Sequence, residues 1–409
     1  MKYVIIGNSP AATYAIEGIR SRDAKGKITV ISDEKHAAYG RPLISYYLYG
    51  RTDLAHIAYR SPEFYEKNGV EVLLGERAEK IDAENKKVLL ASGKKVPYDR
   101  LLVATGSRPF VPPVEGLDSV KEFFNFMTLD DALALEKALS PEKDVLIVGA
   151  GLIGLKCVEG IADRVKSVTV IDLADRILPS ILDEGGAAFV QRKLEERGIR
   201  FILGDSAAKF EKNAAYTKSG KKIPFDLLVI AVGVRPNTEL VKEAGGEVAR
   251  GIVTDDGQWT SLKDVYAAGD NCESFDIASG TRRILALLPN AALQGECAGV
   301  NMAGGDAHFT NAVPMNAIGF FGSHIATAGV YEGECYEEAA HDHYKKLFFR
   351  DNVLKGYILI DCIERAGIYT SLVRNRTPLS DVDVGLLEKS PALMAFSEAA
   401  RRDKLARRQ

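Results

Sequence analysis

The sequence predicts an α/β protein with two successive domains built on parallel sheets, followed by a smaller α+β domain. Three observations support this fold class. The stretch from Tyr3 to Ile19 is repeated as Val145 to Ile161. The apolar runs LLVATG and LVIAVG each end in glycine, as a buried parallel strand does at the ligand-binding edge of a sheet. Residues 309–385 alternate between apolar and polar side chains, which is typical of an antiparallel sheet.

Each copy of the repeat reads as a strand, a turn, a helix and a second strand. A run of four apolar residues opens each copy, and a β-branched strand closes it, at 28–32 and at 168–172. Two such units in one chain predict two Rossmann-like dinucleotide-binding domains. The alignment places Gly7 on Gly149, Ser9 on Gly151 and Ala12 on Gly154.

The second copy carries the complete glycine pattern. Gly149 allows the tight turn, Gly151 lets the backbone approach a pyrophosphate, and Gly154 lets the helix pack closely on the sheet. The start of that helix offers free N–H groups to the phosphates. Asp172 ends the next strand, where its carboxylate accepts hydrogen bonds from ribose hydroxyls and repels a 2′-phosphate. We therefore predict that this domain binds NAD and prefers NADH to NADPH.

The first copy departs from the pattern, since it has Ser9 and Ala12 where glycines are usual. Both side chains are small, so a close approach of a ligand remains possible. Pro10 is tolerated in the first turn of a helix, where its missing N–H has no partner. Either Asp33 or Glu34, which follow the second strand, could hold a ribose.

Composition and charge exclude several classes of function. Side chains are 46% hydrophobic and 27% charged, with a net charge of -3, so we expect no nucleic-acid partner. No apolar run reaches the length of a membrane span. A strand begins at Lys2, where a signal peptide would need an apolar stretch and a cleavage site. We therefore expect a cytoplasmic protein that does not bind membranes.

Cysteines and histidines give no sign of a metal or dithiol centre. The pairs of cysteines that zinc ribbons, iron–sulfur clusters and dithiol centres require are absent, which favours buried structural thiols. The six histidines show no triad or metal spacing, so we predict no metal site and assign no general base. The cysteines are Cys157, Cys272, Cys297, Cys335 and Cys362.

Four further segments, in this order, resemble the pyridine nucleotide–disulfide oxidoreductase family. The resemblance covers about residues 1–385 and implies an FAD domain followed by an NAD domain and an interface domain. It also implies that the carboxylate of Asp270 binds the ribityl chain of FAD, although an Asp there could instead cap a helix. The segments are YDRLLVATGSRP (98–109), FDLLVIAVGVRPN (225–237), VYAAGDNC (265–272) and ALLPNAALQGECAGVNMAG (286–304).

The motifs and the resemblance together give two sets of candidate cofactor-binding residues. For FAD they are Gly7, Ser9, Pro10, Ala11, Ala12, Asp33, Glu34, Arg41, Pro42, Ala78, Ala104, Thr105, Gly106, Gly269, Asp270 and Ala291. For NAD they are Gly149, Gly151, Leu152, Ile153, Gly154, Asp172, Val232 and Gly233.

The segment AAYGRPLISYYLYG (37–50) distinguishes subtypes within the family. Tyr39 stands where thiol-dependent members carry a redox cysteine, so we exclude thiol chemistry. The segment is instead similar to the Y-x-R-P-P-L-S-K stretch of rubredoxin, ferredoxin and assimilatory nitrite reductase flavoproteins. Tyr39, Arg41, Pro42 and Ser45 match that stretch, and the resemblance implies that Arg41 reaches the FAD pyrophosphate.

Two positions depart from those relatives. Tyr46 stands where they have a lysine near the flavin, and Lys156 stands where they have a glutamate. In the family these two side chains form an ion pair beside the flavin and nicotinamide rings. Lys156 near the flavin would stabilise the anionic reduced form and raise its potential. Alternatively, Lys156 points into solvent or pairs with Glu159. Tyr46 and Lys156 are the candidate residues near the flavin.

The predicted domains follow the order of the motifs. Residues 1–112 and 241–308 form the FAD domain, 113–240 the NAD domain and 309–385 the interface domain, with a hairpin at Asp351-Asn352. Residues 386–409 are predicted to form a helical tail, capped by Ser390 with Pro391 in its first turn. Its basic end is either a solvated helix or a docking element for an acidic electron-transfer protein.

Three functions remain open at this point. The leading prediction is an NADH-dependent enzyme that passes electrons through FAD to a rubredoxin-like or iron–sulfur carrier, or to a partner redox subunit. The second is an NADH oxidase that uses oxygen or a small molecule such as a quinone. The third is a subunit in which the flavin is structural. We predict FAD and NAD as cofactors, and we expect a homo- or hetero-oligomer.

Overall fold

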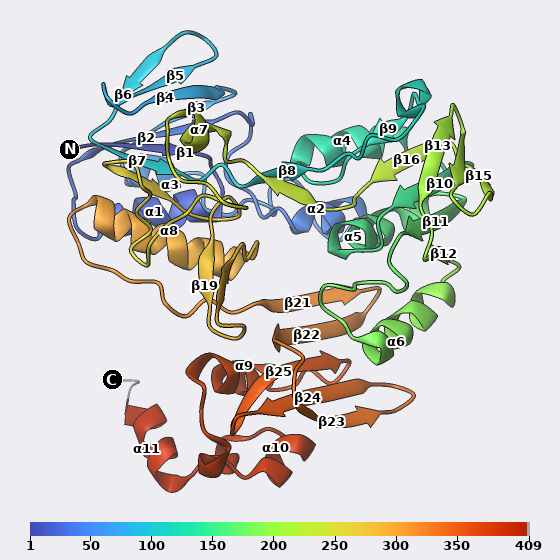
Figure 1. Cartoon of the computed structure of the whole chain (residues 1–409). Coiled ribbons are helices and arrows are strands. Elements are labelled where there is room, and N and C mark those ends of the chain that lie inside the picture. Colours follow the sequence, from blue (N-terminus) through green and yellow to red (C-terminus); the bar gives the residue numbers. More distant parts are fainter. Residues whose placement is uncertain (407–409) are drawn as a thin grey trace.

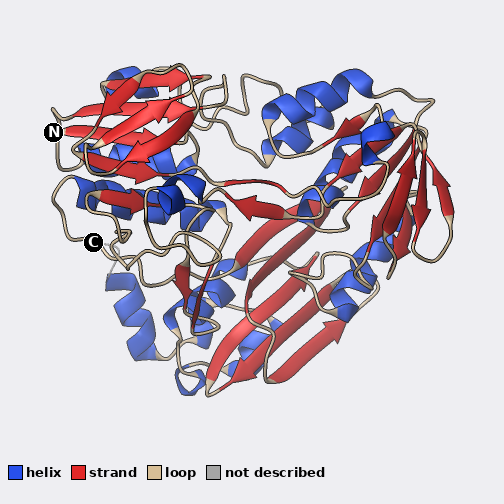
Figure 2. Ribbon diagram, turned by 45° about the horizontal axis from the view of Figure 1, so that its top comes forward, coloured by secondary structure: helices blue, strands red, loops and turns tan. Residues whose placement is uncertain are grey.

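The computed structural model describes residues 1–406, with side chains described for residues 1–402. It contains two parallel five-stranded sheets and one antiparallel five-stranded sheet, which confirms the predicted fold class. In Figure 1 the first sheet lies at the left, the second at the right and the C-terminal sheet below them, and Figure 2 shows the helices that accompany each sheet. Within the described residues, no helix is long and apolar enough to cross a membrane.

The first sheet is parallel and has the order β18-β7-β1-β2-β3. Its central strand pairs Ile5 with Val30 on one side and with Leu102 on the other. Because both faces are covered, the strands read as continuous hydrophobic runs. The strands are β1 (Lys2–Ile6), β2 (Lys27–Ser32), β3 (Val70–Leu74), β7 (Arg100–Val103) and β18 (Val265–Ala267).

Helices α1 (Pro10–Arg20) and α8 (Leu288–Met302) pack together on one face of this sheet. Glycine makes their close contact possible, since a Cβ on Gly295 would lie 2.1 Å from the carbonyl oxygen of Ala11. A small antiparallel sheet covers the opposite face. Its strands are β4 (Ala78–Asp82), β5 (Lys87–Leu90) and β6 (Lys95–Pro97).

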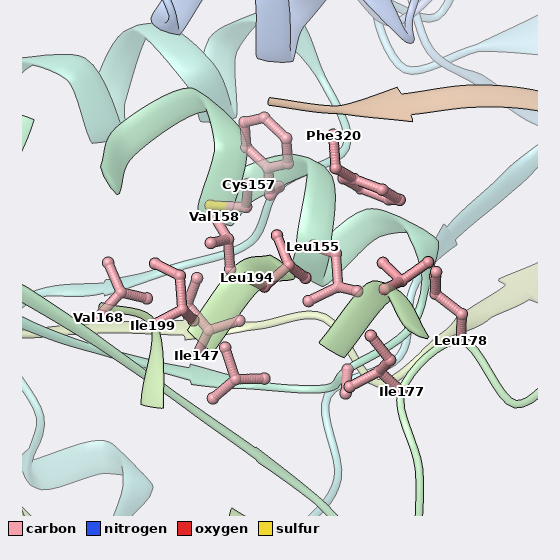
Figure 3. Packing of buried hydrophobic residues seen from close by; sticks show 14 of the residues in the cluster. Ile147, Leu155, Cys157, Val158, Val168, Ile177, Leu178, Leu194, Ile199 and Phe320 are labelled. Carbon is pink, nitrogen blue, oxygen red and sulfur yellow. The ribbon is translucent and has the colours of Figure 1, made fainter. Parts of the chain in front are cut away.

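The second sheet repeats this design, with the order β12-β11-β10-β16-β9. Helices α4 (Leu129–Ala138), α5 (Leu152–Ile161) and α6 (Glu184–Glu195) cover one face, and Figure 3 shows Leu155 and Val158 of α5 packed near Ile147. A three-stranded antiparallel sheet covers the other face. The main strands are β9 (Phe123–Phe124), β10 (Asp144–Val148), β11 (Ser167–Asp172), β12 (Arg200–Leu203) and β16 (Leu227–Ile230), and the covering strands are β13 (Ala207–Glu211), β14 (Ala214–Thr217) and β15 (Lys222–Pro224).

The chain crosses between the two sheets twice, and the two crossings pair with each other. Strand β8 (Ser107–Pro109) runs antiparallel to β17 (Val234–Pro236), after which α7 (Glu239–Glu243) returns toward β4. The turn before β8 is bonded to the end of the second crossing, because Thr105 Oγ1 donates to the carbonyl oxygen of Asn237 at 2.9 Å. The connection is therefore a paired ribbon and not two separate loops (Figure 1).

The C-terminal sheet is antiparallel, with the order β21-β22-β25-β24-β23. The predicted hairpin is confirmed, since Asp351 and Asn352 join β24 to β25 with φ of +53° and +59°. Helix α9 (Ala366–Asn375) packs on this sheet. The strands are β21 (Met315–Phe320), β22 (Ser323–Gly329), β23 (Glu334–Ala339), β24 (Tyr344–Arg350) and β25 (Val353–Ile360). The remaining elements are α2 (Leu43–Leu48), α3 (Phe64–Lys67), and the hairpin of β19 (Ser274–Asp276) and β20 (Thr281–Arg283).

The C-terminal tail differs from its prediction. Ser390 is the C-cap of α10 (Val384–Lys389), so the expected helix with Ser390 as N-cap and Pro391 in its first turn is wrong. The last helix, α11 (Glu398–Ala406), starts after Ser397, whose hydroxyl accepts a hydrogen bond from Ala400 N–H at 3.3 Å.

Burial in the C-terminal core explains this difference. Phe396 is 4% exposed and bridges to Val382, so the segment after Ser390 is held in the core instead of continuing an exposed helix. The predicted boundary before residue 386 also falls inside α10, whose Leu387 is fully buried in the same core. The basic end of the predicted helix, at 401–408, lies partly outside the described residues.

Candidate functional site

The first glycine turn joins β1 to α1 and is closed against the neighbouring strand. Gly7 has φ of +110°, and a Cβ there would lie 2.1 Å from the carbonyl oxygen of Ala104, so only glycine fits. Ser9 is the N-cap of α1, and its side chain makes no capping hydrogen bond; Pro10 is the first helical residue. The amides at the start of α1 are therefore available to an anion, despite the replaced glycines.

Arg41 lies directly beside this turn. Its guanidinium donates to Ser9 Oγ at 3.4 Å and to the carbonyl oxygen of Met127 at 3.3 Å, and it forms an ion pair with Glu34. Of the two acids that follow β2, Glu34 belongs to this cluster, whereas Asp33 is exposed to solvent. Pro42, the other predicted residue of this segment, is the N-cap of α2.

Asp270 follows β18 at the carboxyl-terminal edge of the first sheet, where the first glycine turn also lies. Gly269 before it has φ of +94° and donates its N–H to Gln294 Oε1 at 2.7 Å. Burial raises the pKa of the Asp270 carboxyl to about 6, and the positive charge of Arg41 opposes that rise. Among the described residues, Asp270 has no hydrogen-bond partner, and the next helix, α8, is capped by Leu287. Asp270 therefore does not cap a helix.

The other predicted FAD residues lie on neighbouring strands and helices. Ala104 N–H donates to Ile6 at 2.7 Å, which brings the A-T-G turn against β1, and Gly106 in that turn has φ of +60°. Ala11 and Ala12 are buried in α1, and Ala291 is 6% exposed in α8. Ala78 opens β4. The edge thus brings together the first glycine turn, Arg41, the A-T-G turn and Asp270.

The second glycine turn joins β10 to α5, and each glycine meets the geometric need predicted for it. Gly149 has φ of +118°, and a Cβ there would lie 2.3 Å from the carbonyl oxygen of Ala231. A Cβ on Gly154 would lie 2.0 Å from the carbonyl oxygen of Gly149. Gly151, the N-cap of α5, has nothing within 4 Å of its Cβ position and leaves space for a ligand. Leu152 and Ile153 form the first turn of α5.

Asp172 has a role that the sequence did not reveal. Its carboxylate accepts hydrogen bonds from Ala150 N–H at 2.6 Å and from Ala174 N–H at 2.8 Å, so it fixes the glycine turn against the end of β11. A carboxylate accepts more than two hydrogen bonds, which leaves capacity for ribose hydroxyls. Val232, 37% exposed, and Gly233, with φ of +114°, lie beyond the end of β16, the neighbouring strand. These residues therefore border the same edge.

Lys156 and Tyr46 lie in contact. The Lys156 Nζ is 4.3 Å from the centroid of the Tyr46 ring and forms an ion pair with Glu159. The Lys156 side chain is 16% exposed, so the solvated alternative is wrong, and the pairing with Glu159 is what the structure contains. The two positions at which the resemblance predicts an ion pair thus carry a cation–π contact.

Tyr39, at the position where the resemblance predicts a redox cysteine in other members, is a buried phenol. Its hydroxyl donates to Glu34 Oε2 at 2.7 Å and accepts from Leu129 N–H at 2.9 Å. Cys157, Cys272 and Cys297 are buried, and burial raises the pKa of the Cys157 and Cys272 thiols. The expected buried thiols are therefore present at these three positions, but Cys335 is exposed.

Both edges fit a bound dinucleotide on grounds of geometry alone. Each has a turn that only glycine can close, followed by a helix whose N-cap residue makes no side-chain capping hydrogen bond. The first edge adds a cation, Arg41, and the carboxylate of Asp270. The second adds Asp172. This donor set matches a pyrophosphate with sugar hydroxyls on either side.

The fold and these two edges define a nicotinamide-dependent flavoprotein oxidoreductase of the electron-transfer type. The chain belongs to the pyridine nucleotide-disulphide oxidoreductase family, whose profile matches residues 1–295. This family binds FAD and NAD(P)H. The resemblance predicted from the sequence is confirmed.

Individual relatives agree with this assignment. The chain is 32% identical over 392 residues to the NADH-dependent phenylglyoxylate dehydrogenase subunit epsilon of Aromatoleum evansii, covering 93% of both chains. It is 29% identical to the NADH-rubredoxin oxidoreductase of Clostridium acetobutylicum, covering 88% of this chain and 90% of that protein. The structure of the putidaredoxin reductase–putidaredoxin complex shares the fold, with a TM-score of 0.87 at 23% identity and 95% coverage of both chains.

Further relatives include ferredoxin reductases, NADH oxidases and nitrite reductases. The chain spans about half the length of the nitrite reductases, 48% and 46% in two of them.

Proposed function

We propose that this protein oxidises NADH through FAD and passes the electrons to a protein redox carrier or a partner redox subunit. One observation carries the proposal: a single chain holds two turns that each close on a glycine, Gly7 and Gly149, with Arg41 and Asp270 beside the first and Asp172 beside the second. The second edge can bind the nicotinamide nucleotide that donates the electrons, and the first edge can bind the flavin that accepts them. When bound, FAD accepts a hydride and then releases electrons singly or in pairs.

The residues of the chain bind and orient the two nucleotides. The start of α5 and its glycine turn hold the NADH pyrophosphate, and Asp172 accepts from the ribose hydroxyls while it repels a 2′-phosphate. Arg41 and the start of α1 hold the FAD pyrophosphate. Asp270 accepts hydrogen bonds from the ribityl hydroxyls. The protein supplies position and charge, and no side chain is assigned a proton-transfer step.

A protein acceptor is favoured for two reasons. Tyr39 replaces the redox cysteine, so no thiol at that position receives the electrons. The relative from Aromatoleum evansii, similar over 93% of both chains, is named as a subunit of an NADH-dependent dehydrogenase. A rubredoxin-like or iron–sulfur carrier, or a larger redox complex, is the matching acceptor class.

A second candidate is an NADH oxidase, supported by 33% identity to an NADH oxidase of Methanocaldococcus jannaschii over 76% of this chain. Reoxidation of the reduced protein separates the two. The FAD-loaded protein is reduced with one equivalent of NADH without oxygen, then mixed with aerated buffer or with rubredoxin or ferredoxin. We expect slow reoxidation in air and fast reoxidation by a carrier. Fast reoxidation in air that a carrier does not accelerate would favour the oxidase.

A further inference from the structure

Three separate parts of the chain meet at Lys156. Its ammonium group lies over the ring of Tyr46, on α2 of the first domain, at 4.3 Å from the ring centroid. It also donates to the carbonyl oxygen of Gly319, in β21 of the C-terminal sheet, at 3.1 Å. Lys156 itself belongs to α5, the helix that begins at the second glycine turn. One side chain therefore contacts all three domains.

Glu159 completes this junction from the next turn of α5. It is 1% exposed, and one carboxylate oxygen forms the ion pair with Lys156. The other oxygen accepts from Phe321 N–H at 2.9 Å. The adjacent Phe320 is 2% exposed and belongs to the same buried hydrophobic cluster as Leu155 and Cys157 of α5 (Figure 3). The turn after β21 is thus bonded to α5 by hydrogen bonds and by packing.

Close helix packing fixes Tyr46 relative to Lys156. Helix α2 packs on α5 where Gly160 removes a side chain, since a Cβ there would lie 3.1 Å from the carbonyl oxygen of Ser45 and 3.1 Å from Leu48 Cβ. A side chain at residue 160 would therefore push the two helices apart. The ring of Tyr46 and the ammonium of Lys156 are held together by this contact.

We propose that Tyr46, Lys156 and Glu159 are positioning residues for electron transfer from NADH. They fix α5, and with it the glycine turn at Gly149–Gly154, against the first domain and the C-terminal turn. This inference rests on the proposed function, because it needs NADH on that turn. The buried ion pair carries no net charge, so the contribution is geometric. An error of about 1 Å in the placement of a reactant can cost about 100-fold in rate.

The test compares two substitutions of the same residue in the full-length, FAD-loaded protein. Tyr46→Leu removes the ring, whereas Tyr46→Phe keeps it and removes only the hydroxyl. We expect the rate of flavin reduction at saturating NADH, measured by anaerobic stopped-flow, to fall about tenfold in Tyr46→Leu. The phenylalanine variant should retain a rate within about twofold of that of the unaltered protein. The dissociation constant of NADH should stay within about twofold in both, because the glycine turn itself is unchanged.

A third variant tests the junction from its other side. Glu159→Gln keeps an acceptor for Phe321 N–H and removes the partner charge of Lys156. We expect the same loss of reduction rate, again with unchanged NADH affinity. If Tyr46→Leu does not retain FAD, this variant decides the question.

Three results would overturn the inference. They are a normal rate in Tyr46→Leu or in Glu159→Gln, an equal loss in the leucine and phenylalanine variants, and a change in NADH affinity alone. Failure of the unaltered protein to be reduced by NADH is a different result, since it would contradict the proposed function itself.

Discussion

The phenol oxygen of Tyr39 accepts a 2.9 Å hydrogen bond from the backbone N–H of Leu129, the first residue of α4. The bond crosses from the first domain to the second, and Tyr39 simultaneously donates to Glu34 at 2.7 Å. Burial raises the pKa of Tyr39, so the phenol keeps its proton. Tyr39, which the resemblance places at the position of a redox cysteine, thus links the first five-stranded sheet domain to the second.

Tyr39→Phe should lower the free energy of unfolding by about 1–3 kcal/mol, because it leaves the Leu129 N–H and the Glu34 carboxylate without this partner. Urea unfolding measures the change. Tyr46→Phe is the matched control, since its hydroxyl has no hydrogen-bond partner among the described residues, and it should stay within about 0.5 kcal/mol. Equal stability of Tyr39→Phe and the unaltered protein would refute the structural role.

Replacement of Asp172 should affect NADH more than NADPH. Asp172→Ala removes the ribose acceptor, the repulsion of a 2′-phosphate and the hydrogen bonds that hold the Ala150 and Ala174 amides. We expect kcat/KM for NADH to fall by at least about tenfold, and the ratio of NADH to NADPH rates to narrow. The control is Asp175→Ala, whose side chain is 81% exposed and outside the glycine turn. An unchanged ratio in Asp172→Ala would contradict the assignment.

FAD affinity should depend on pH through Asp270. Burial disfavours the charged form of its carboxyl and raises the pKa to about 6. Sugar hydroxyls donate to the ionised form, so binding favours the carboxylate and should weaken as the pH falls through 6. The apparent Kd should rise by up to about tenfold per pH unit below that value. Asp270→Asn should bind FAD more weakly at pH 7 and lose this slope; a slope that persists in the variant would assign it to another group.

The raised pKa of Asp270 also makes the stability of the protein without FAD depend on pH, but in the opposite direction: stability falls as the pH rises. The folded state holds a proton on Asp270 up to about pH 6, whereas an unfolded aspartate loses it near pH 4. Between these values the folded state binds more protons, so stability from this group falls as the pH rises through that window. Thermal unfolding of the cofactor-free protein at pH 5 and pH 7, compared with Asp270→Asn, measures this effect.

No thiol should take part in flavin reduction. Cys157, Cys272 and Cys297 are buried, and the exposed Cys335 lies on β23, in the C-terminal sheet. Alkylation of the accessible thiols in the folded protein should leave the rate of reduction by NADH unchanged. Loss of that rate, with the circular dichroism spectrum retained, would restore a role for a cysteine.

Much of the two edges could be predicted from sequence because the requirements are local. Gly7 and Gly149 each need positive φ in a turn that directly follows a strand, and Asp172 must end the strand that pairs with β10. A short window of sequence contains all the residues of each requirement. The hairpin at Asp351-Asn352 is local in the same sense.

The contacts that sequence did not predict depend on packing between distant segments. Two partners of Lys156 come from α2 and β21, and sequence spacing cannot place these elements beside α5. The tail was assigned wrongly for the same reason, since burial of Phe396 against Val382 ends the exposed helical pattern. Asp172 accepts its hydrogen bonds from the backbone N–H groups of Ala150 and Ala174. Every residue except proline has such a group, so the sequence does not indicate which of them a side chain will bind.

The central claim is that one chain binds FAD and accepts electrons from NADH. Anaerobic stopped-flow spectroscopy of the FAD-loaded protein tests it most directly. We expect about one FAD per chain, and a visible flavin absorbance that is bleached rapidly by one equivalent of NADH and much more slowly by NADPH. A folded protein that takes up no FAD, or a bound flavin that NADH does not bleach, would contradict it.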